Sequence, residues 1–401
     1  MRVLHSFKVY TAEREGGIQR AITALAAGMR DSDYQHDYFT LADDGPWRHD
    51  RPDANLTVHA ARRAGAICAT DISLTARRQF RALAREADVI HYHLPWPMVH
   101  VLDGQVPSGT PRVATYHSDI CRNPFLTRLY EPLMERFLRS LDAVIATTDV
   151  YTRTSPVLQR LSVEQVDVVE LGVEVAAPSD GAIDAASDAL ASVVGEGFML
   201  FLGATRRYKG APVAIDALRH TATRLVIAGE CRDQSALEEQ AERAGVRDRV
   251  AFLGRVTEAG KWALLWRCRA LVMPATLRSE AFGLALVEAG AAGRPAITCE
   301  IGTGTSVVVQ DGQTGLVVPP NESALLGEAM QRLHTDPALA TALGEAGYRR
   351  YCEHFTAAAY GGRMQRIYDR LIGRGGSASV KFSGYGVLNT GAVGHHQEAK
   401  P

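Results

Sequence analysis

The stretch from residue 278 to residue 290 reads RSEAFGLALVEAG and carries two carboxylates, Glu280 and Glu288, within a mostly apolar run. A carboxylate in such surroundings costs free energy unless a partner compensates for it. A general acid and base, a metal site, and two acceptors for a polar ligand are the candidate chemistries. A helical pattern from Phe282 to Ala292 places Glu280 before the helix and Glu288 along it, so we expect them to bind opposite ends of one elongated ligand. A structural ion pair is the alternative for Glu288.

A cationic loop lies in FLGATRRYKG, where Arg206, Arg207 and Lys209 follow an expected strand at Phe198–Leu202. Guanidinium and ammonium groups at the carboxyl end of a strand suit a diphosphate, which arginine can hold through two hydrogen bonds. We therefore expect Arg206 and Lys209 to bind phosphate, whereas Arg207 fits a solvated position. An ordinary solvated loop is the alternative for all three.

Glycines precede two of the expected helices. Gly16 and Gly17 come before a helical pattern at Ile18–Met29, and Gly283 precedes the helix that carries Glu288. Free backbone N–H groups and the helix dipole attract an anion at such positions. The G-x-G-x-x-G dinucleotide fingerprint is absent, and ordinary turns would use the same glycines. A later glycine-rich loop, EIGTGTSVVVQDGQTGLVVPP, fits either a wall of the site or ordinary turns.

Histidines supply the remaining candidates. His117 follows an expected strand at Arg112–Tyr116, where an imidazole can donate to a ligand oxygen or transfer protons near neutral pH. A buried structural histidine fits that position equally well. His91 and His93 share one face of another strand, but the sequence shows no third ligand, so we predict no metal site.

Short apolar strands alternate with helical patterns along most of the chain, and the candidate residues come just after strands. The expected strands form two series: Val3–Phe7, Tyr38–Leu41, Leu56–His59, Val89–His93, Arg112–Tyr116, Ala143–Thr147 and Val166–Val169, then Phe198–Leu202, Arg224–Ala228, Val250–Leu253, Ala270–Met273, Ala296–Thr298 and Gly315–Val318. The expected helices include Ile18–Met29, Leu74–Ala87, Leu126–Ser140, Ala211–His220, Ser235–Ala244, Glu322–His334, Pro337–Phe355 and Ala357–Ile372. Apolar strands between helices indicate parallel sheets buried on both faces.

Thirteen strands are too many for one ordinary sheet, so we predict an α/β protein with two doubly wound, Rossmann-like domains that face a deep cleft. The first domain covers residues 1–172 and the second covers 198–356, with an Ala-, Ser-, Asp- and Gly-rich linker at 173–197. A terminal helix at 357–372 is expected to pack back on the first domain. Residues 373–401 lack periodicity and are expected to be disordered.

Composition excludes several classes of protein. A formal net charge of −1 over 401 residues argues against a dedicated nucleic-acid binder. The six cysteines form no C-x-x-C pair, which is typical of reduced thiols in a cytosolic protein. The N-terminus does not resemble a signal peptide, and no apolar run is long enough to span a membrane. The stretch TARRQFRALAREA fits either a basic amphipathic helix on a membrane surface, with Arg77, Arg78 and Arg81 beside Phe80 and Leu83, or an ordinary solvated helix.

Five motifs in order, GGIQR, TYHSD, FLGATRRYKG, SEAFGLALVE and DGQTGLVVPP, resemble those of retaining glycosyltransferases of glycosyltransferase family 4 over roughly residues 1–372. The resemblance implies a GT-B fold and metal-independent transfer of a hexose from a nucleotide sugar, with the acceptor on the first domain and the donor on the second. The implied catalytic residues are His117, Glu280, Arg206 and Lys209. The implied substrate-binding residues are Gly16, Gly17, Arg206, Lys209, Gly254, Arg255, Val256, Glu280, Ala281, Phe282, Gly283, Leu284 and Glu288.

The resemblance also assigns roles within that set. Gly17, Arg206 and Lys209 would hold the donor diphosphate, Glu280 would bind sugar hydroxyls and Glu288 the ribose. His117 would contact the transferring sugar, and the nucleobase would rest on the loop at residues 254–256. This chain departs from the family pattern at Ala204, where an arginine is usual and Arg206 would substitute, and at Glu174, where an aspartate is more usual.

More narrowly, HYHLPWP, TYHSDICR, RRYKG and EIGTGTS resemble bacterial mannosyl- and rhamnosyltransferases that build O-antigen or capsular polysaccharide. That group commonly uses GDP-activated sugars, so the resemblance favours GDP-mannose or GDP-rhamnose over a UDP-sugar, with no cofactor. A glycan or polyprenyl-linked acceptor implies a cytoplasmic enzyme, with possible peripheral contact at the inner membrane. A GT-B nucleotide-sugar epimerase and a non-catalytic nucleotide-sugar-binding subunit are the alternative functions.

Overall fold

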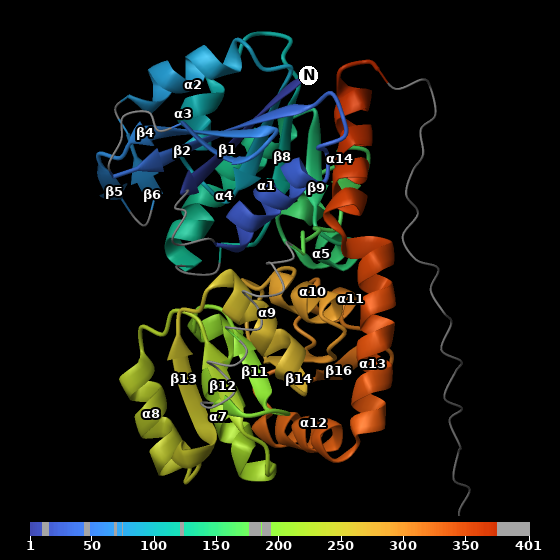
Figure 1. Cartoon of the computed structure of the whole chain (residues 1–401). Coiled ribbons are helices and arrows are strands. Elements are labelled where there is room, and N and C mark those ends of the chain that lie inside the picture. The colour runs from blue at the N-terminus through green and yellow to red at the C-terminus, as the bar shows by residue number, and fades with distance from the viewer. Residues whose placement is uncertain are drawn as a thin grey trace, which may run out of the picture.

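The computed structural model describes residues 1–9, 16–43, 49–67, 70–73, 75–120, 124–175, 186 and 194–374. Two large sheets, each covered by helices, form an upper and a lower unit in Figure 1. Every strand that the sequence predicts is present. Most of the predicted linker and of the predicted disordered tail, together with Cys68 and Cys121, lies outside the described residues. The other four cysteines, Cys231, Cys268, Cys299 and Cys352, are free thiols.

The first sheet has eight strands in the order β10-β9-β8-β7-β1-β2-β4-β3, and β3 alone runs antiparallel to its neighbour. Its strands are β1 (Arg2–Val9), β2 (Gln35–Ala42), β3 (His49–Asp53), β4 (Leu56–Arg62), β7 (Val89–Leu94), β8 (Arg112–Tyr116), β9 (Ala143–Ala146) and β10 (Val166–Val168). Its helices are α1 (Gly17–Ala27), α2 (Ala76–Ala84), α3 (Val99–Asp103), α4 (Pro124–Arg139) and α5 (Asp149–Thr154), with a 3-10 turn η1 (Leu158–Arg160). Strands β5 (Gly65–Ile67) and β6 (Thr70–Ile72) pair separately.

The second sheet has six parallel strands in the order β13-β12-β11-β14-β15-β16. They are β11 (Met199–Leu202), β12 (Leu225–Ala228), β13 (Val250–Gly254), β14 (Ala270–Met273), β15 (Ala296–Cys299) and β16 (Gly315–Val318). The covering helices are α7 (Ala211–Ala217), α8 (Gln234–Arg243), α9 (Glu258–Arg267), α10 (Leu284–Ala291), α11 (Thr305–Val308), α12 (Ser323–Thr335) and α13 (Pro337–Arg350), with shorter turns η2 (Arg207–Lys209), η3 (Leu218–His220), η4 (Arg247–Arg249) and η5 (Tyr351–Phe355). The central strands are buried along their whole length, as their apolar sequences predict.

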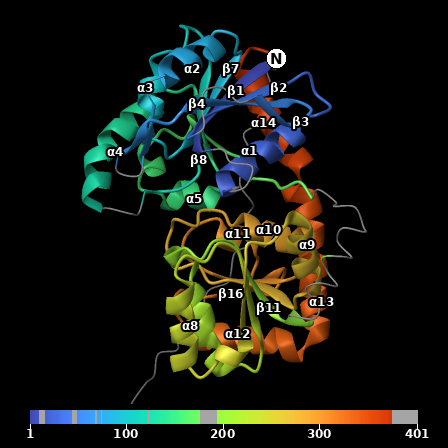
Figure 2. The same ribbon diagram turned by 60° about the vertical axis from the view of Figure 1, so that its left-hand side comes forward.

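The last described helix, α14 (Ala357–Leu371), leaves the second domain and packs against α1 of the first. Figures 1 and 2 both show α13 beside the lower unit and α14 beside the upper one. The two helices approach closely at Gly28, where a Cβ atom would lie 1.9 Å from the carbonyl oxygen of Ala357. Side chains of α14, among them Tyr360 and Met364, belong to a core cluster that also contains Val3 and Leu25.

Some short or polar elements were not among those predicted from the sequence: β3, β5, β6, α3, α5, α9 and α11. Strand β3 reads HDRPD and has no apolar alternation, so the usual strand signal is missing. Helix α9 reads EAGKWALLWR and starts at the N-cap Thr257, whose side chain accepts a hydrogen bond from the backbone of Gly260. That helix contributes to the candidate site.

Candidate active site

Two helix N-termini meet between the domains. Helix α1 starts at Gly17 and α10 at Leu284, and a Cβ atom on Gly17 would lie 3.7 Å from the Cδ1 atom of Leu284. Gly283 caps α10 with a φ of 87°, a left-handed conformation that favours glycine, and a Cβ atom there would lie 2.7 Å from the Cδ1 atom of Leu286. Neither helix has an acidic residue in its first turn. Free N–H groups from both domains are therefore brought together in a place that suits an anion.

Lys209, which follows β11, and Glu280, which follows β14, form an ion pair beyond the carboxyl ends of these strands, with 3.3 Å between Nζ and Oε2. Burial lowers the pKa of Lys209, but the Glu280 carboxylate and Tyr208 raise it by more, so the pKa lies above its usual 10.5. A Cβ atom on Gly203, which ends β11, would lie 3.5 Å from this Nζ. Lys209 is thus a fixed cation at the strand end, whereas Arg207 is exposed.

Arg206 is also exposed, and its charge acts on Glu230, as does that of Arg255 from the predicted nucleobase loop. A hydrogen bond from Arg232 and the charges of Arg255 and Arg206 lower the pKa of the Glu230 carboxyl. Glu230 follows β12 and Arg255 follows β13, and the neighbouring strand ends are joined by a 2.6 Å hydrogen bond that the carbonyl of Gly254 accepts. The predicted phosphate and nucleobase loops therefore both lie at the carboxyl ends of the strands of the second sheet.

Glu288 is buried and already paired. Its Oε1 atom accepts hydrogen bonds of 2.6 Å from Lys261 on α9 and 2.6 Å from Arg20 on α1. Arg20 also contacts Glu258 at 3.1 Å, so this ionic cluster crosses from the first domain to the second. Burial raises the pKa of Glu258, but Lys261 and Arg20 lower it by more, and the net pKa is lowered. The ion pair that the sequence left open for Glu288 is present, and a role in ligand binding would have to include Arg20 and Lys261.

A second arginine also joins the two domains, in this case from the second domain to the first. Arg278, from the same motif as Glu280, approaches the Asp119 carboxylate of the first domain at 3.3 Å and donates to Thr154 Oγ1 at 3.1 Å. Its guanidinium lies 5.3 Å from the ring centre of Tyr151 and donates to the carbonyl of Gly302 at 2.7 Å. Arg20 and Arg278 together hold the two domains against each other at the site.

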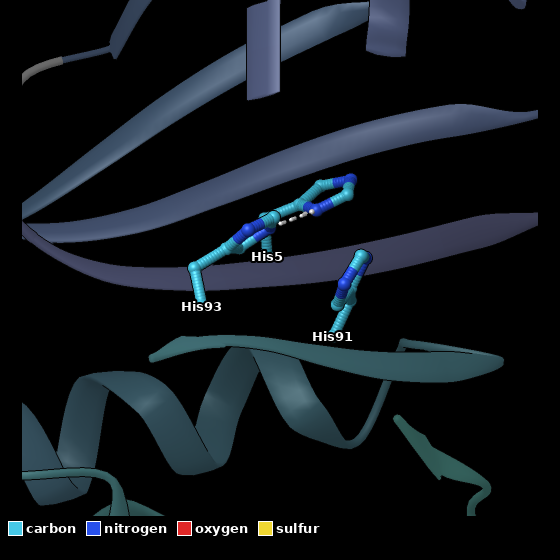
Figure 3. Close-up of side chains that lie close together, drawn as sticks. All are labelled: His5, His91 and His93. Atoms are coloured by element: carbon cyan, nitrogen blue, oxygen red, sulfur yellow. Dashed lines mark hydrogen bonds between the residues drawn. The ribbon is translucent and has the colours of Figure 1, made fainter. Parts of the chain in front are cut away.

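His117 lies at the carboxyl end of the first sheet and is buried, with its Nε2 atom 2.9 Å from Nδ1 of His93. Burial lowers the pKa of His117 to about 3, so the ring is neutral near neutral pH and the predicted proton transfer is disfavoured there. The structure also corrects the prediction that His91 and His93 lack a third partner. One ring nitrogen from each of His5, His91 and His93 lies within 4.8 Å of the other two (Figure 3), although His5 is far away in sequence.

A cavity of about 190 Å³ opens between α4 and the Arg278 contact. Its lining includes Tyr116, Asp119, Tyr130, Met134, Val157 and Arg278. All of these except Arg278 belong to the first domain. The cavity combines aromatic faces, a carboxylate and a guanidinium beside the domain boundary.

Helix α2 is amphipathic, and its apolar face packs onto the first domain while Arg77, Arg78 and Arg81 are exposed. Phe80 is fully buried in the first core, and Arg81 donates to the Gln105 side chain at 2.9 Å. The apolar face of α2 is therefore used for packing and is closed to a membrane. Within the described part of the chain, no helix is long and apolar enough to cross a membrane.

The structure places most predicted site residues along one boundary between the domains. Gly16 caps α1, Ala281 and Phe282 are buried before α10, and Val256 packs against the core beyond β13. Sequence reasoning missed Arg20, Lys261, Glu258 and Arg278 as members of the site. Arg20 stands in the motif GGIQR and Arg278 in RSEAFG, so both were within quoted motifs, but their partners come from the other domain.

Two family profiles match the chain. Residues 15–177 match the profile described as Glycosyltransferase Family 4, and residues 183–350 match the one described as Glycosyl transferases group 1. Among curated relatives, D-rhamnosyltransferase WbpZ of Pseudomonas aeruginosa is 41% identical over 363 residues, which cover 89% of this chain and 93% of the relative. O-antigen chain mannosyltransferase C of Escherichia coli is 36% identical over 361 residues, covering 89% and 95% respectively.

Solved structures with similar folds cover nearly the whole chain. Sucrose-phosphate synthase from Thermosynechococcus elongatus superposes with a TM-score of 0.76 at 20% identity, over 93% of this chain and 100% of that one. HepE of Anabaena, in complex with UDP and glucose, superposes with a TM-score of 0.73 at 18% identity, over 92% and 100%. These matches confirm the predicted GT-B fold.

Proposed function

Because the chain belongs to glycosyltransferase family 4, as a retaining and metal-independent hexosyltransferase, we propose that it transfers mannose or rhamnose from a GDP-sugar to a growing surface glycan. The observation that carries this proposal is the similarity, across 89% of the chain, to a D-rhamnosyltransferase and to an O-antigen chain mannosyltransferase. The UDP complexes of HepE do not oppose a GDP donor, since 18% identity speaks for the fold alone.

The donor diphosphate would lie between the N-termini of α1 and α10. Backbone N–H groups at Gly17 and Leu284 would donate to its oxygens, and Lys209 and Arg206 would supply the cationic charge. Cleavage of the bond between the sugar C1 and the diphosphate leaves negative charge on the phosphate, which these groups stabilise in place of a metal ion. Glu280, held by Lys209, would accept hydrogen bonds from sugar hydroxyls.

The ribose would bind at Glu288 without displacing its partners. A carboxylate offers about four lone-pair positions, and Arg20 and Lys261 both use Oε1. Ribose hydroxyls can therefore join the cluster. Since Arg20 comes from the first domain, the Glu288 carboxylate would both bind the nucleotide and hold the two domains together.

The retaining reaction needs no enzymic nucleophile in this scheme. The acceptor hydroxyl attacks the sugar on the face that the diphosphate leaves, and the departing phosphate takes the acceptor's proton. His117 stays neutral because burial lowers its pKa to about 3. Its role would be to hydrogen-bond the transferring sugar rather than to act as a base.

The acceptor would occupy the cavity beside α4. Aromatic rings of Tyr116 and Tyr130 suit the apolar faces of sugars, and Asp119 and Arg278 suit their hydroxyls. On the outer side of α4, Leu129 and Leu133 are 73% and 51% exposed, next to the exposed Arg128 and Arg136. This combination fits an anionic membrane surface, where a polyprenyl-linked acceptor would be delivered.

The proposed transferase activity is tested by incubating the protein with GDP-mannose or GDP-rhamnose, with and without a lipid-linked glycan extract. Transfer of labelled sugar to the extract supports the proposal. Release of an epimer or free sugar without acceptor would indicate an epimerase, and binding without turnover would indicate a non-catalytic subunit.

The identity of the donor's nucleobase is tested by thermal-shift measurements with GDP and UDP. A nucleotide at a hundredfold its Kd stabilises the folded protein by about 2.7 kcal/mol. A shift with UDP and none with GDP would overturn the GDP assignment.

The roles of the two carboxylates are separated by kinetics. Glu288→Gln should chiefly raise the donor KM, whereas Glu280→Gln should lower kcat as well, because only Glu280 is placed at the transferring sugar. Equal losses of kcat alone in both variants would assign them to acid–base chemistry instead.

A further inference from the structure

A continuous row of four imidazoles leads from His117 into the first sheet. Nε2 of His117 lies 2.9 Å from Nδ1 of His93, whose Nε2 lies 3.1 Å from Nδ1 of His5. Nε2 of His5 lies in turn 2.9 Å from Nδ1 of His36. The rings come from four adjacent segments, β2, β1, β7 and the residue after β8, so the order and the register of the strands bring them into line. We call these four residues the imidazole row.

Each member of the imidazole row is at most 6% exposed. Burial and neighbouring histidines lower the pKa values of His5 and His93, and burial lowers that of His117. A neutral imidazole carries one N–H donor and one bare nitrogen acceptor. Every contact in the row therefore needs a donor on one ring and an acceptor on the next.

When all four rings are neutral, only two arrangements of the protons satisfy all three contacts. Either all four rings carry the proton on Nδ1, or all four carry it on Nε2, because each contact joins an Nε2 atom to an Nδ1 atom. A ring with the other tautomer would place two donors or two acceptors against each other. The tautomer of His117 is thus tied to that of His36, although two rings lie between them.

We propose that His93, His5 and His36 are positioning residues that fix the ring tautomer of His117. In one arrangement His117 offers Nδ1–H as a donor to the sugar, and in the other it offers bare Nδ1 as an acceptor for a sugar hydroxyl. This part of the inference rests on the proposed contact between His117 and the transferring sugar. The coupling between the rings does not, since it follows from the hydrogen bonds alone.

A metal ion bound by His5, His91 and His93 is the competing explanation of the cluster in Figure 3. The hydrogen bonds oppose it. His91 lies 2.7 Å from Tyr368 through Nδ1 and 2.7 Å from Thr115 through Nε2, and both nitrogens of His5 and of His93 face other imidazoles. A metal ion would have to break these hydrogen bonds in order to bind the ring nitrogens.

The coupling is tested by NMR on protein labelled with 15N in its histidine rings. Long-range proton–nitrogen correlations distinguish the two tautomers without any substrate. We expect the four rings of the wild-type protein to share one tautomer. Different tautomers within the row, or a stoichiometric metal that EDTA removes with a change in these signals, would overturn the proposal.

Substitution at the far end of the row tests whether the effect is transmitted. His36→Leu removes the partner of His5 and should alter the tautomer population of His117, whereas His36→Asn keeps a hydrogen-bonding group near Nδ1 and should restore most of it. The matched control is His59→Asn, because His59 is buried in the same sheet but bonds Asp37 at 2.6 Å. An unchanged His117 signal in His36→Leu, or an equal change in the control, contradicts the coupling.

Kinetics then connect the row to the reaction. His36→Leu should lower kcat about tenfold, which corresponds to about 1.4 kcal/mol, with little change in the donor KM, and His36→Asn should recover most of the loss. A purely structural defect would lower activity alike in His36→Leu and His59→Asn and would contradict a positioning role. If no donor supports turnover, the proposed function fails, while the NMR result still decides the coupling.

Discussion

Acid should destabilise the first domain, because four of its imidazoles are buried in neutral form. Burial lowers the pKa values of His5, His91 and His93 well below 6.5, and that of His117 to about 3. Unfolding exposes these rings, which then titrate near their ordinary pKa of about 6.5. Below that pH the unfolded state binds more protons than the folded state. The free energy of unfolding therefore has its full value well above pH 6.5 and decreases as the pH falls below it.

The size of the effect follows from the number of rings. One pH unit below the ordinary pKa, at about pH 5.5, each ring lowers the free energy of unfolding by about 1.4 kcal/mol. Four such rings together remove about 5.6 kcal/mol, which is a large share of a typical total of about 5–15 kcal/mol. At about pH 8 neither state protonates these rings, and the loss vanishes.

The assay is the uptake of protons when the protein is unfolded in urea, measured in a weakly buffered solution. This count does not require that the two domains unfold in one step. About 3.6 protons should be taken up by the four rings at about pH 5.5 and almost none at about pH 8. His91→Gln and His93→Asn should each reduce the uptake at the lower pH by about 0.9 proton. Uptake below about one proton at pH 5.5 would mean that the rings are already charged in the folded protein, and the assignment of neutral imidazoles would be wrong.

Three further predictions concern other features. Arg20→Gln and Glu288→Gln should be non-additive in their effect on stability, with a coupling of about 0.5–3 kcal/mol in a double-mutant cycle, because the two side chains are in contact; additive effects would show that the ion pair does not hold the domains. Gly28→Ala should lower the melting temperature, since its Cβ atom would meet the backbone of α14, whereas Gly362→Ala, which meets nothing within 4 Å, should not lower it. Cys352, which is exposed, should react rapidly with a thiol reagent, and Cys352→Ser should remove one fast-reacting thiol.

The sheets could be predicted from the sequence because their signal is local. Each predicted strand is a short apolar run, and a run buried on both faces needs no knowledge of its neighbours. Strand β3, with the sequence HDRPD, has no such signal and is ordered by its pairing with β4. Helix α9 was also missed, and with it Lys261, which contacts Glu288.

The candidate site was predictable where a residue stands in a local motif at the end of a strand. Lys209 and Glu280 each stand in a motif that follows a strand, and the structure pairs them. The partnership of Arg20 with Glu288 joins residues 268 positions apart and depends on how the domains meet, which no local pattern records. The imidazole row depends likewise on the order β2-β1-β7-β8, since its members are unremarkable histidines until the strands are placed side by side.

The position of α14 has a consequence for how the chain is made. The core around Val3 and Leu25 includes side chains of α14, so the first domain cannot complete its packing until the ribosome has released residues 357–371. The second domain lies between them in sequence and can fold earlier from its own segments. Synthesis therefore begins with the first domain but finishes it last, and its unsealed face must be kept from aggregating while the second domain emerges.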